Sequence, residues 1–296
     1  MTASLLDPAF LRRLEALRRS LVSSVRSGGA GERAARRRGA SAEFLDHRRY
    51  EPGDDPRHIH WAAFARTRET VTKLYRAEED TVLRLVLDAS ASLGFGDPPK
   101  LAVARRLAAA LAYLSLAGGG RTELRIARST SDGVPLVRAG PVRRGRAAFA
   151  PVCRELERVE ASGGTDLAAA VQTLLAQTTH PGLLCLISDF LDDNPVTPAV
   201  GRARAAGHDV ILIQVLDSAE LDPDFEGDFS LEDAETSETL DVSLDATALE
   251  AYRARLHALF AELGTWARKN GAVYVRLSTA DDPWGAIRRI LGRATE

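Results

Sequence analysis

The chain has 296 residues, a formal net charge of −2 and a hydrophobic fraction of 45%. These values are ordinary for a soluble globular protein, and they exclude a uniformly basic polyanion binder. The charge is uneven, because residues 1–50 contain eleven Arg and five acidic residues, whereas residues 217–247 contain twelve acidic residues and no Lys or Arg.

No uninterrupted apolar run reaches the ~20 residues that a membrane span requires. Arginines at positions 12, 13, 18 and 19 interrupt the opening segment, so we expect neither a signal peptide nor a membrane span. The two cysteines, Cys153 and Cys185, lack metal-ligand spacing. A reduced, cytoplasmic location is therefore predicted.

Residues 1–40 are predicted to form an amino-terminal helix and a basic linker. Asp7-Pro8 is typical of a helix start, and leucines at 11, 14, 17 and 21 follow at helical spacing up to Ser27-Gly28-Gly29. The basic segment 26–39 suits either a solvated linker or a patch for an anionic partner. Because it lacks an aromatic platform or a recognition motif, we expect no nucleic-acid binding.

Residues 41–80 are predicted to form an extension with β structure. Turn residues occupy 51–56, and Thr70–Tyr75 is typical of a strand. His58 and His60 lie two residues apart, which would suit a metal pair, but without a third ligand nearby ordinary polar contacts are the favoured interpretation.

Strand and helix patterns alternate over residues 81–296. Strands are expected near 82–87, 123–127, 183–187, 210–215 and 273–277, and helices near 97–117, 145–159, 165–177, 195–206, 245–270 and 284–291. This alternation predicts an α/β domain with a mostly parallel sheet and helices on both faces. An acidic excursion at 217–244 interrupts the pattern. Its residues Phe229, Leu231, Leu240 and Val242 predict a hairpin, either solvated or used as a docking edge.

Oxygen-bearing side chains lie at three places in this pattern, each at the end of a predicted strand or in a loop before a helix. Asp88, Ser90 and Ser92 follow the buried run 82–87, Thr165 opens a helix, and Asp189 follows Leu183–Ile187. Because the carboxyl ends of parallel strands share one edge of a sheet, these five residues are expected to converge. Hydroxyl and carboxylate oxygens suit Mg²⁺, or alternatively Mn²⁺ or Ca²⁺, and an incomplete ligand set leaves a position for a carboxylate of another protein.

The order Asp88-Ala-Ser90-Ala-Ser92, Gly163-Gly-Thr165 and Ser188-Asp189 resembles the metal-ion-dependent adhesion site of von Willebrand factor A domains. The segment from Glu43 to Trp61, with Ala65-Arg66-Thr67, resembles the signature of the bacterial family called domain of unknown function 58. The resemblance covers roughly residues 38–296. It implies a von Willebrand factor A-like fold and metal-dependent protein binding without catalysis. It also implies a MoxR-type AAA+ ATPase as partner, which the protein would help direct to an unknown client.

A Mg²⁺-dependent phosphatase of the haloacid-dehalogenase type is the alternative. Such enzymes need a second Asp two residues after the first as general acid, and that position here is Ser90. They also need a lysine beside the phosphate. The chain has only Lys73, Lys100 and Lys269, and none is expected at the sheet edge. The chain is therefore predicted not to be an enzyme.

Overall fold

The centre of the protein is a seven-stranded mixed sheet with the order β11-β8-β7-β3-β4-β5, in which β6 also pairs with β4. In this computed structural model the described residues are 4–27, 44–51, 59–75, 81–129, 135–192, 194–223, 227–232 and 239–293. The strands of the sheet are β3 (Val82–Asp88), β4 (Arg121–Ser129), β5 (Pro135–Ala139), β6 (Arg143–Arg144), β7 (Leu183–Ser188), β8 (Asp209–Leu216) and β11 (Val273–Ser278).

Five of these strands run parallel to one another, and only β5 and β6 pair antiparallel with β4. In the central strand β3 every residue from Leu83 to Asp88 is buried, because helices cover both faces of the sheet. This arrangement confirms the predicted α/β class and the mostly parallel sheet.

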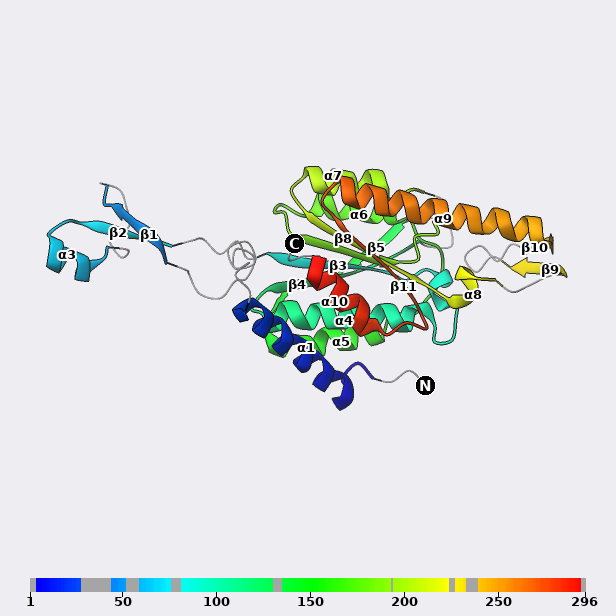
Figure 1. The fold of residues 1–296 in the computed structure, drawn as a ribbon, viewed down its shortest axis with the longest axis horizontal. Coiled ribbons are helices and arrows are strands. Elements are labelled where there is room, and N and C mark those ends of the chain that lie inside the picture. The colour runs from blue at the N-terminus through cyan, green and yellow to red at the C-terminus, as the bar shows by residue number, and fades with distance from the viewer. Residues whose placement is uncertain are drawn as a thin grey trace.

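Two helical layers enclose the sheet, one on each face (Figure 1). The first layer consists of α1 (Pro8–Ser27), α4 (Lys100–Ala117), α5 (Phe149–Glu157) and α10 (Pro283–Arg293). The second consists of α6 (Leu167–Gln177), α7 (Thr197–Ala205) and α9 (Ala246–Lys269). Each layer has its own apolar core. Leu14, Leu107 and Ile287 belong to the first core, and Val171 and Leu263 belong to the second.

Helix boundaries near the sheet edge differ slightly from those expected. Helix α4 begins at Lys100 rather than at Asp97, because the residues before it form a turn that contains Pro98 and Pro99. A short 3-10 helix, η3 (Arg146–Ala148), precedes α5. Helix α6 begins at Leu167, where the carboxylate of Asp166 accepts a hydrogen bond from the amide of Ala169 at 2.8 Å. This cap fixes the start of α6 directly after Thr165.

The amino-terminal extension contains the expected β structure. Strands β1 (Phe44–Arg49) and β2 (Val71–Tyr75) pair antiparallel, and helix α3 (Trp61–Thr67) lies between them in the sequence. Neither β1 nor α3 was predicted, since the polar sequence of β1 lacks apolar alternation. His58, one of the two histidines for which ordinary polar contacts are the favoured interpretation, lies outside the described residues. Within the described ranges, no helix is long and apolar enough to cross a membrane.

The acidic excursion contains the predicted hairpin. Strands β9 (Gly227–Glu232) and β10 (Thr239–Leu244) pair antiparallel, with Phe229 opposite Val242 and Leu231 opposite Leu240. A one-turn helix, α8 (Ser218–Leu221), precedes the hairpin and directly follows β8. The excursion therefore leaves the sheet from the same edge at which the oxygen-bearing loops lie.

Candidate metal site

A carboxylate is buried at the end of β3. Asp88 has no exposed surface. Its Oδ1 accepts a hydrogen bond from the amide of Ser90 at 2.9 Å, and its Oδ2 accepts one from the hydroxyl of Ser188 at 2.6 Å. Ser188 ends the neighbouring strand β7, so the two strand ends hold the Asp88 carboxylate from both sides.

The residues that follow β3 and β7 meet as the sequence predicts. The hydroxyl oxygens of Ser90 and Ser92 lie 3.0 Å apart, and the Ser92 hydroxyl donates to Oδ2 of Asp189 at 2.8 Å. Ser92 and Asp189 are 97 positions apart in the sequence. The expected convergence of the two strand ends is therefore confirmed.

The loop that carries Thr165 packs against the loop after β3. The amide of Ala91 donates to the carbonyl of Gly163 at 2.7 Å, and the amide of Ser162 donates to the carbonyl of Ala89 at 2.9 Å. Gly163 has φ +65°, and a Cβ atom there would lie 2.6 Å from the carbonyl oxygen of Ser129, so this close approach requires glycine. The buried hydroxyl of Thr165 has no hydrogen-bond partner among the described residues.

A lysine that the sequence analysis placed away from this edge belongs to the cluster. Lys100, in the first turn of α4, has no exposed surface, and its Nζ donates to Asp189 Oδ2 at 2.7 Å and to Glu220 Oε1 at 2.5 Å. The expectation that no lysine lies at the sheet edge is wrong. The turn after η2 (Ala91–Gly94) brings the start of α4 back toward β7. The spacing of residues in the sequence does not predict this path of the chain.

Glu220 is the second residue that the sequence analysis missed. Its other carboxylate oxygen, Oε2, accepts a hydrogen bond from the amide of Asp217 at 2.8 Å, while Asp217 caps α8 by accepting from the amide of Ala219. This reciprocal pair is a capping box, and the spacing Asp217-x-x-Glu220 is a signal that the sequence does contain. Lys100 thereby joins the acidic excursion to Asp189.

The cluster carries more negative than positive charge. The ammonium group of Lys100 contacts two carboxylates, those of Asp189 and Glu220, while a third carboxylate, that of Asp88, accepts from the hydroxyl of Ser188. Burial, together with the nearby carboxylate of Asp189, raises the pKa of Asp88 to about 7. Burial lowers the pKa of Lys100, but the carboxylates of Asp189 and Glu220 outweigh it and raise this pKa above its usual value. A further cation would favour the ionised form of every carboxylate here.

The donor set fits a small hard cation. Within the described residues, no group of three or more His, Cys, Asp and Glu side chains could hold a metal ion. A cation at this edge would therefore depend on hydroxyl oxygens, of which Ser90, Ser92 and the unpartnered Thr165 supply three. Mg²⁺ prefers oxygen ligands and retains water molecules, so few charged ligands suffice.

The fold is an α/β domain with a mostly parallel sheet between two helical layers. Residues 46–262 match the family described as protein of unknown function DUF58, and the chain belongs to this family. It is 34% identical over 252 residues to the uncharacterized protein Rv1480 of Mycobacterium tuberculosis, a match that covers 82% of this chain and 77% of the relative. An uncharacterized protein of Mycobacterium bovis, Mb1516, matches with the same identity and coverage.

Solved structures of low sequence identity are also similar to parts of this chain. The conserved hypothetical protein BatB from Bacteroides thetaiotaomicron is 15% identical with a TM-score of 0.45, covering 73% of this chain and 100% of that one. A von Willebrand factor type A protein from Catenulispora acidiphila is 13% identical with a TM-score of 0.40, covering 76% of this chain and 44% of that one.

Proposed function

We propose that this protein is a non-catalytic, metal-dependent protein-binding module. In this proposal Asp88, Ser90, Ser92, Thr165 and Asp189 hold a Mg²⁺ ion, or alternatively Mn²⁺ or Ca²⁺, at the carboxyl edge of the sheet. A carboxylate from a partner protein would complete the coordination of the ion. The ion supplies positive charge at an otherwise acidic edge, and it makes that edge attractive to an acidic side chain.

The observation that carries the proposal is the unbalanced charge of the buried cluster. Without a further cation, two negative charges stay uncompensated when all groups are ionised, because Lys100 offsets only one of three carboxylates. Burying uncompensated charge is costly. A dication balances the cluster and also provides a partner for the Thr165 hydroxyl, which lacks one among the described residues.

Lys100 does not turn the site into a phosphatase. Its ammonium group is fully buried and bonded to Asp189 and Glu220, so it does not face a position open to phosphate. Ser90 still occupies the position where the general acid of a haloacid-dehalogenase-type enzyme would stand, and a serine hydroxyl does not act as an acid near neutral pH. The binding function is therefore preferred over phosphotransfer.

Thermal unfolding in increasing Mg²⁺ tests the proposal. Mg²⁺ at a hundred times its dissociation constant should stabilise the wild-type protein by ~2.7 kcal/mol. Asp88→Asn should abolish this increase. Asp222→Asn, the same chemical change at an exposed carboxylate that pairs with Arg253, should retain it. A wild-type midpoint that does not move in excess Mg²⁺, Mn²⁺ or Ca²⁺ would refute the proposal.

The proposed partner is a MoxR-type AAA+ ATPase, which this module would help direct to a client protein. The family resemblance is the support for this choice, and the cytoplasmic location expected from the cysteine usage agrees with it. Purified ATPase should bind the immobilised protein in Mg²⁺, and the binding should be lost in excess EDTA and in Thr165→Val. Binding that is indifferent to both changes would contradict a metal-dependent interaction.

A further inference from the structure

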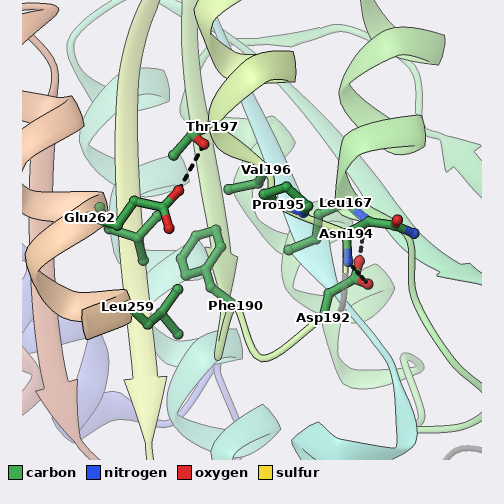
Figure 2. A pocket seen from close by; sticks show the side chains of 10 residues that line it. Leu167, Phe190, Asp192, Asn194, Pro195, Val196, Thr197, Leu259 and Glu262 are labelled. Carbon is green, nitrogen blue, oxygen red and sulfur yellow. Dashed lines mark hydrogen bonds between the residues drawn. The ribbon is translucent and has the colours of Figure 1, made fainter. Parts of the chain in front are cut away.

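The domain around the seven-stranded sheet buries its apolar side chains even where its surface is hollowed. A pocket of about 280 Å³ lies between the loop after β7 and helices α6, α7 and α9 (Figure 2). Four of the apolar residues that line it are buried members of the second core, namely Leu167, Phe190, Val196 and Leu263. This part of the chain therefore requires no partner to bury its apolar side chains.

Two smaller units of the chain lack such a core. One is the amino-terminal extension, which contains β1, β2 and α3, and the other is the acidic hairpin of β9 and β10; the sheet in each has only two strands. Among the side chains that the structure describes in these units, only Thr72 is buried, and none belongs to either apolar core. A two-stranded sheet that buries so little apolar surface is marginally stable by itself. A second surface that covers either unit would therefore stabilise it.

Helix α3 has an aromatic side and a basic end. Trp61 is 62% exposed, and its ring meets the ring of Phe64 edge-on, with the two centroids 6.2 Å apart. Ala65, four residues after Trp61, lies on the same side of the helix and is exposed. At the carboxyl end Arg66 and Arg68 are exposed, and neither has an ion-pair partner among the described residues. An exposed Trp beside arginines without partners is typical of a surface that binds another protein.

The acidic hairpin has the complementary properties. Residues 217–247, which include it, contain twelve acidic residues and no Lys or Arg. Phe229 is 36% exposed and lies opposite the half-buried Val242 in the register of β9 and β10. Asp241, next to Val242, is exposed. The hairpin therefore combines an apolar pair with a high density of negative charge, which attracts arginine side chains.

The two units lie at opposite ends of the molecule. Figure 1 shows β1, β2 and α3 at one end and β9 and β10 at the other, with the seven-stranded sheet between them. A contact between the extension and the hairpin in this arrangement requires a second copy of the chain. Because the contact joins two different surfaces, each copy in a pair keeps one of its two surfaces uncovered. Further copies then add head to tail, and they form a ring or an open chain.

We propose that the amino-terminal extension of one copy docks on the acidic hairpin of a second copy. Trp61 of the first copy packs against Phe229 of the second. Arg66 and Arg68 pair with carboxylates of the acidic excursion. The contact covers exposed apolar surface on both units and brings arginines without partners to a segment of excess negative charge. It does not involve the metal site, so it is independent of the proposed function.

Sedimentation velocity of the full chain over a range of protein concentrations tests the inference. In low salt the 31.9 kDa monomer should give way to larger species as the concentration rises. High salt should weaken this association, because ions screen attraction between exposed charges. The double change Arg66→Glu and Arg68→Glu should weaken it at least about tenfold, since it reverses the charge on one side of the contact. The matched control, Arg12→Glu with Arg13→Glu on the exposed side of α1, should associate as wild type does.

A mixing experiment distinguishes this contact from other modes of association. A hairpin variant with Phe229→Ser and Asp241→Lys should also fail to self-associate, but it keeps an intact extension. The variant with Arg66→Glu and Arg68→Glu keeps an intact hairpin. The two variants mixed should therefore form one-to-one dimers and nothing larger, and circular dichroism melting shows that each is folded.

Three results would overturn the inference. The first is a wild-type protein that stays monomeric in low salt at its highest soluble concentration. The second is association that the changes at Arg66 and Arg68 leave unaltered. The third is a mixture of the two folded variants that stays monomeric. Association should also persist in excess EDTA, and its loss there would place the metal in the contact and contradict the proposed interface.

Discussion

Two buried ionic clusters each include one residue of strand β3, and they differ in how their charges are compensated. In the first, Arg84 and Arg125 both contact the carboxylate of Glu123, with nitrogen–oxygen distances of 3.3 Å and 2.6 Å. In the second, four residues further along β3, Asp88 receives hydrogen bonds from Ser90 and Ser188 but has no salt-bridge partner within the described residues.

Under the proposed function, the first cluster is structural and the second binds a cation. Every charged group of the Glu123 cluster contacts an opposite charge, and Arg125 also donates to the amide oxygen of Gln177 at 2.7 Å. Each charged group of this cluster therefore has an ion-pair partner within the chain, while Nε and Nη1 of Arg84 have no hydrogen-bond partner among the described residues. The Asp88 cluster has more carboxylates than ammonium groups, and the loop packed against it carries Thr165, whose buried hydroxyl has no hydrogen-bond partner in the described structure. In the proposed function a cation completes this second cluster.

Removing the shared carboxylate of the first cluster should have the largest effect. Glu123→Ala leaves two buried guanidinium groups without their partner, and we expect it to lower the free energy of unfolding by about 3–5 kcal/mol. Urea unfolding measures this loss. It should be the same with and without Mg²⁺, since a metal plays no part in this cluster. A loss that Mg²⁺ repairs would erase the distinction between the clusters.

Removing the internal cation of the second cluster should be almost as damaging, but only without a metal. Lys100→Met leaves the carboxylates of Asp189 and Glu220 unpaired, at an expected cost of about 3 kcal/mol. The cost lies at the lower end of the range because the Glu220 side chain is 17% exposed. Mg²⁺ should recover more stability in this variant than it adds to wild type. Equal gains in both proteins would show that Lys100 and the metal do not share the same carboxylates.

Two threonines with unpartnered buried hydroxyls provide a smaller and sharper contrast. In the described structure neither Thr165 nor Thr122 has a hydrogen-bond partner for its hydroxyl, and Thr122 lies at the amino end of β4, far along the strand from the carboxyl edge of the sheet. Thr165→Val and Thr122→Val should each raise metal-free stability by about 1 kcal/mol, since each replaces a buried unpaired hydroxyl with a methyl group. Only Thr165→Val should weaken Mg²⁺ binding in a calorimetric titration. Equal effects on Mg²⁺ binding would remove Thr165 from the ligand set.

An exposed ion pair should contribute least to the free energy of unfolding. Arg253 and Asp222 lie 2.7 Å apart, and their side chains are 42% and 82% exposed. Because water screens such pairs, Arg253→Ala should change the free energy of unfolding by less than about 1 kcal/mol. The change in the free energy of unfolding, obtained from thermal melts, should agree within that margin in low and high salt. A larger loss would mean that ionic contacts in this protein cannot be ranked by burial.

The sequence alone predicted most of the fold and the converging strand ends. Long apolar runs such as Leu183–Ile187 identify buried strands, and parallel strands bring their carboxyl ends to one edge, so Ser92 and Asp189 could be paired in advance. Lys100 could not be identified in this way. Its contact with Glu220 spans 120 positions and depends on how α4 and α8 pack at the edge. The pocket beside Phe190 was missed for the same reason, since the positions of α6, α7 and α9 create it together.

A crystal structure determined in the presence of Mn²⁺, with anomalous difference maps, tests the central claim most directly. The account predicts one anomalous peak at the carboxyl edge of the sheet, bonded to the hydroxyl oxygens of Ser90, Ser92 and Thr165, with Asp88 and Asp189 close to it. The peak should vanish in Asp88→Asn crystals grown under the same conditions. A well-ordered edge without a peak in saturating Mn²⁺, or a peak that none of these hydroxyls contacts, would contradict it.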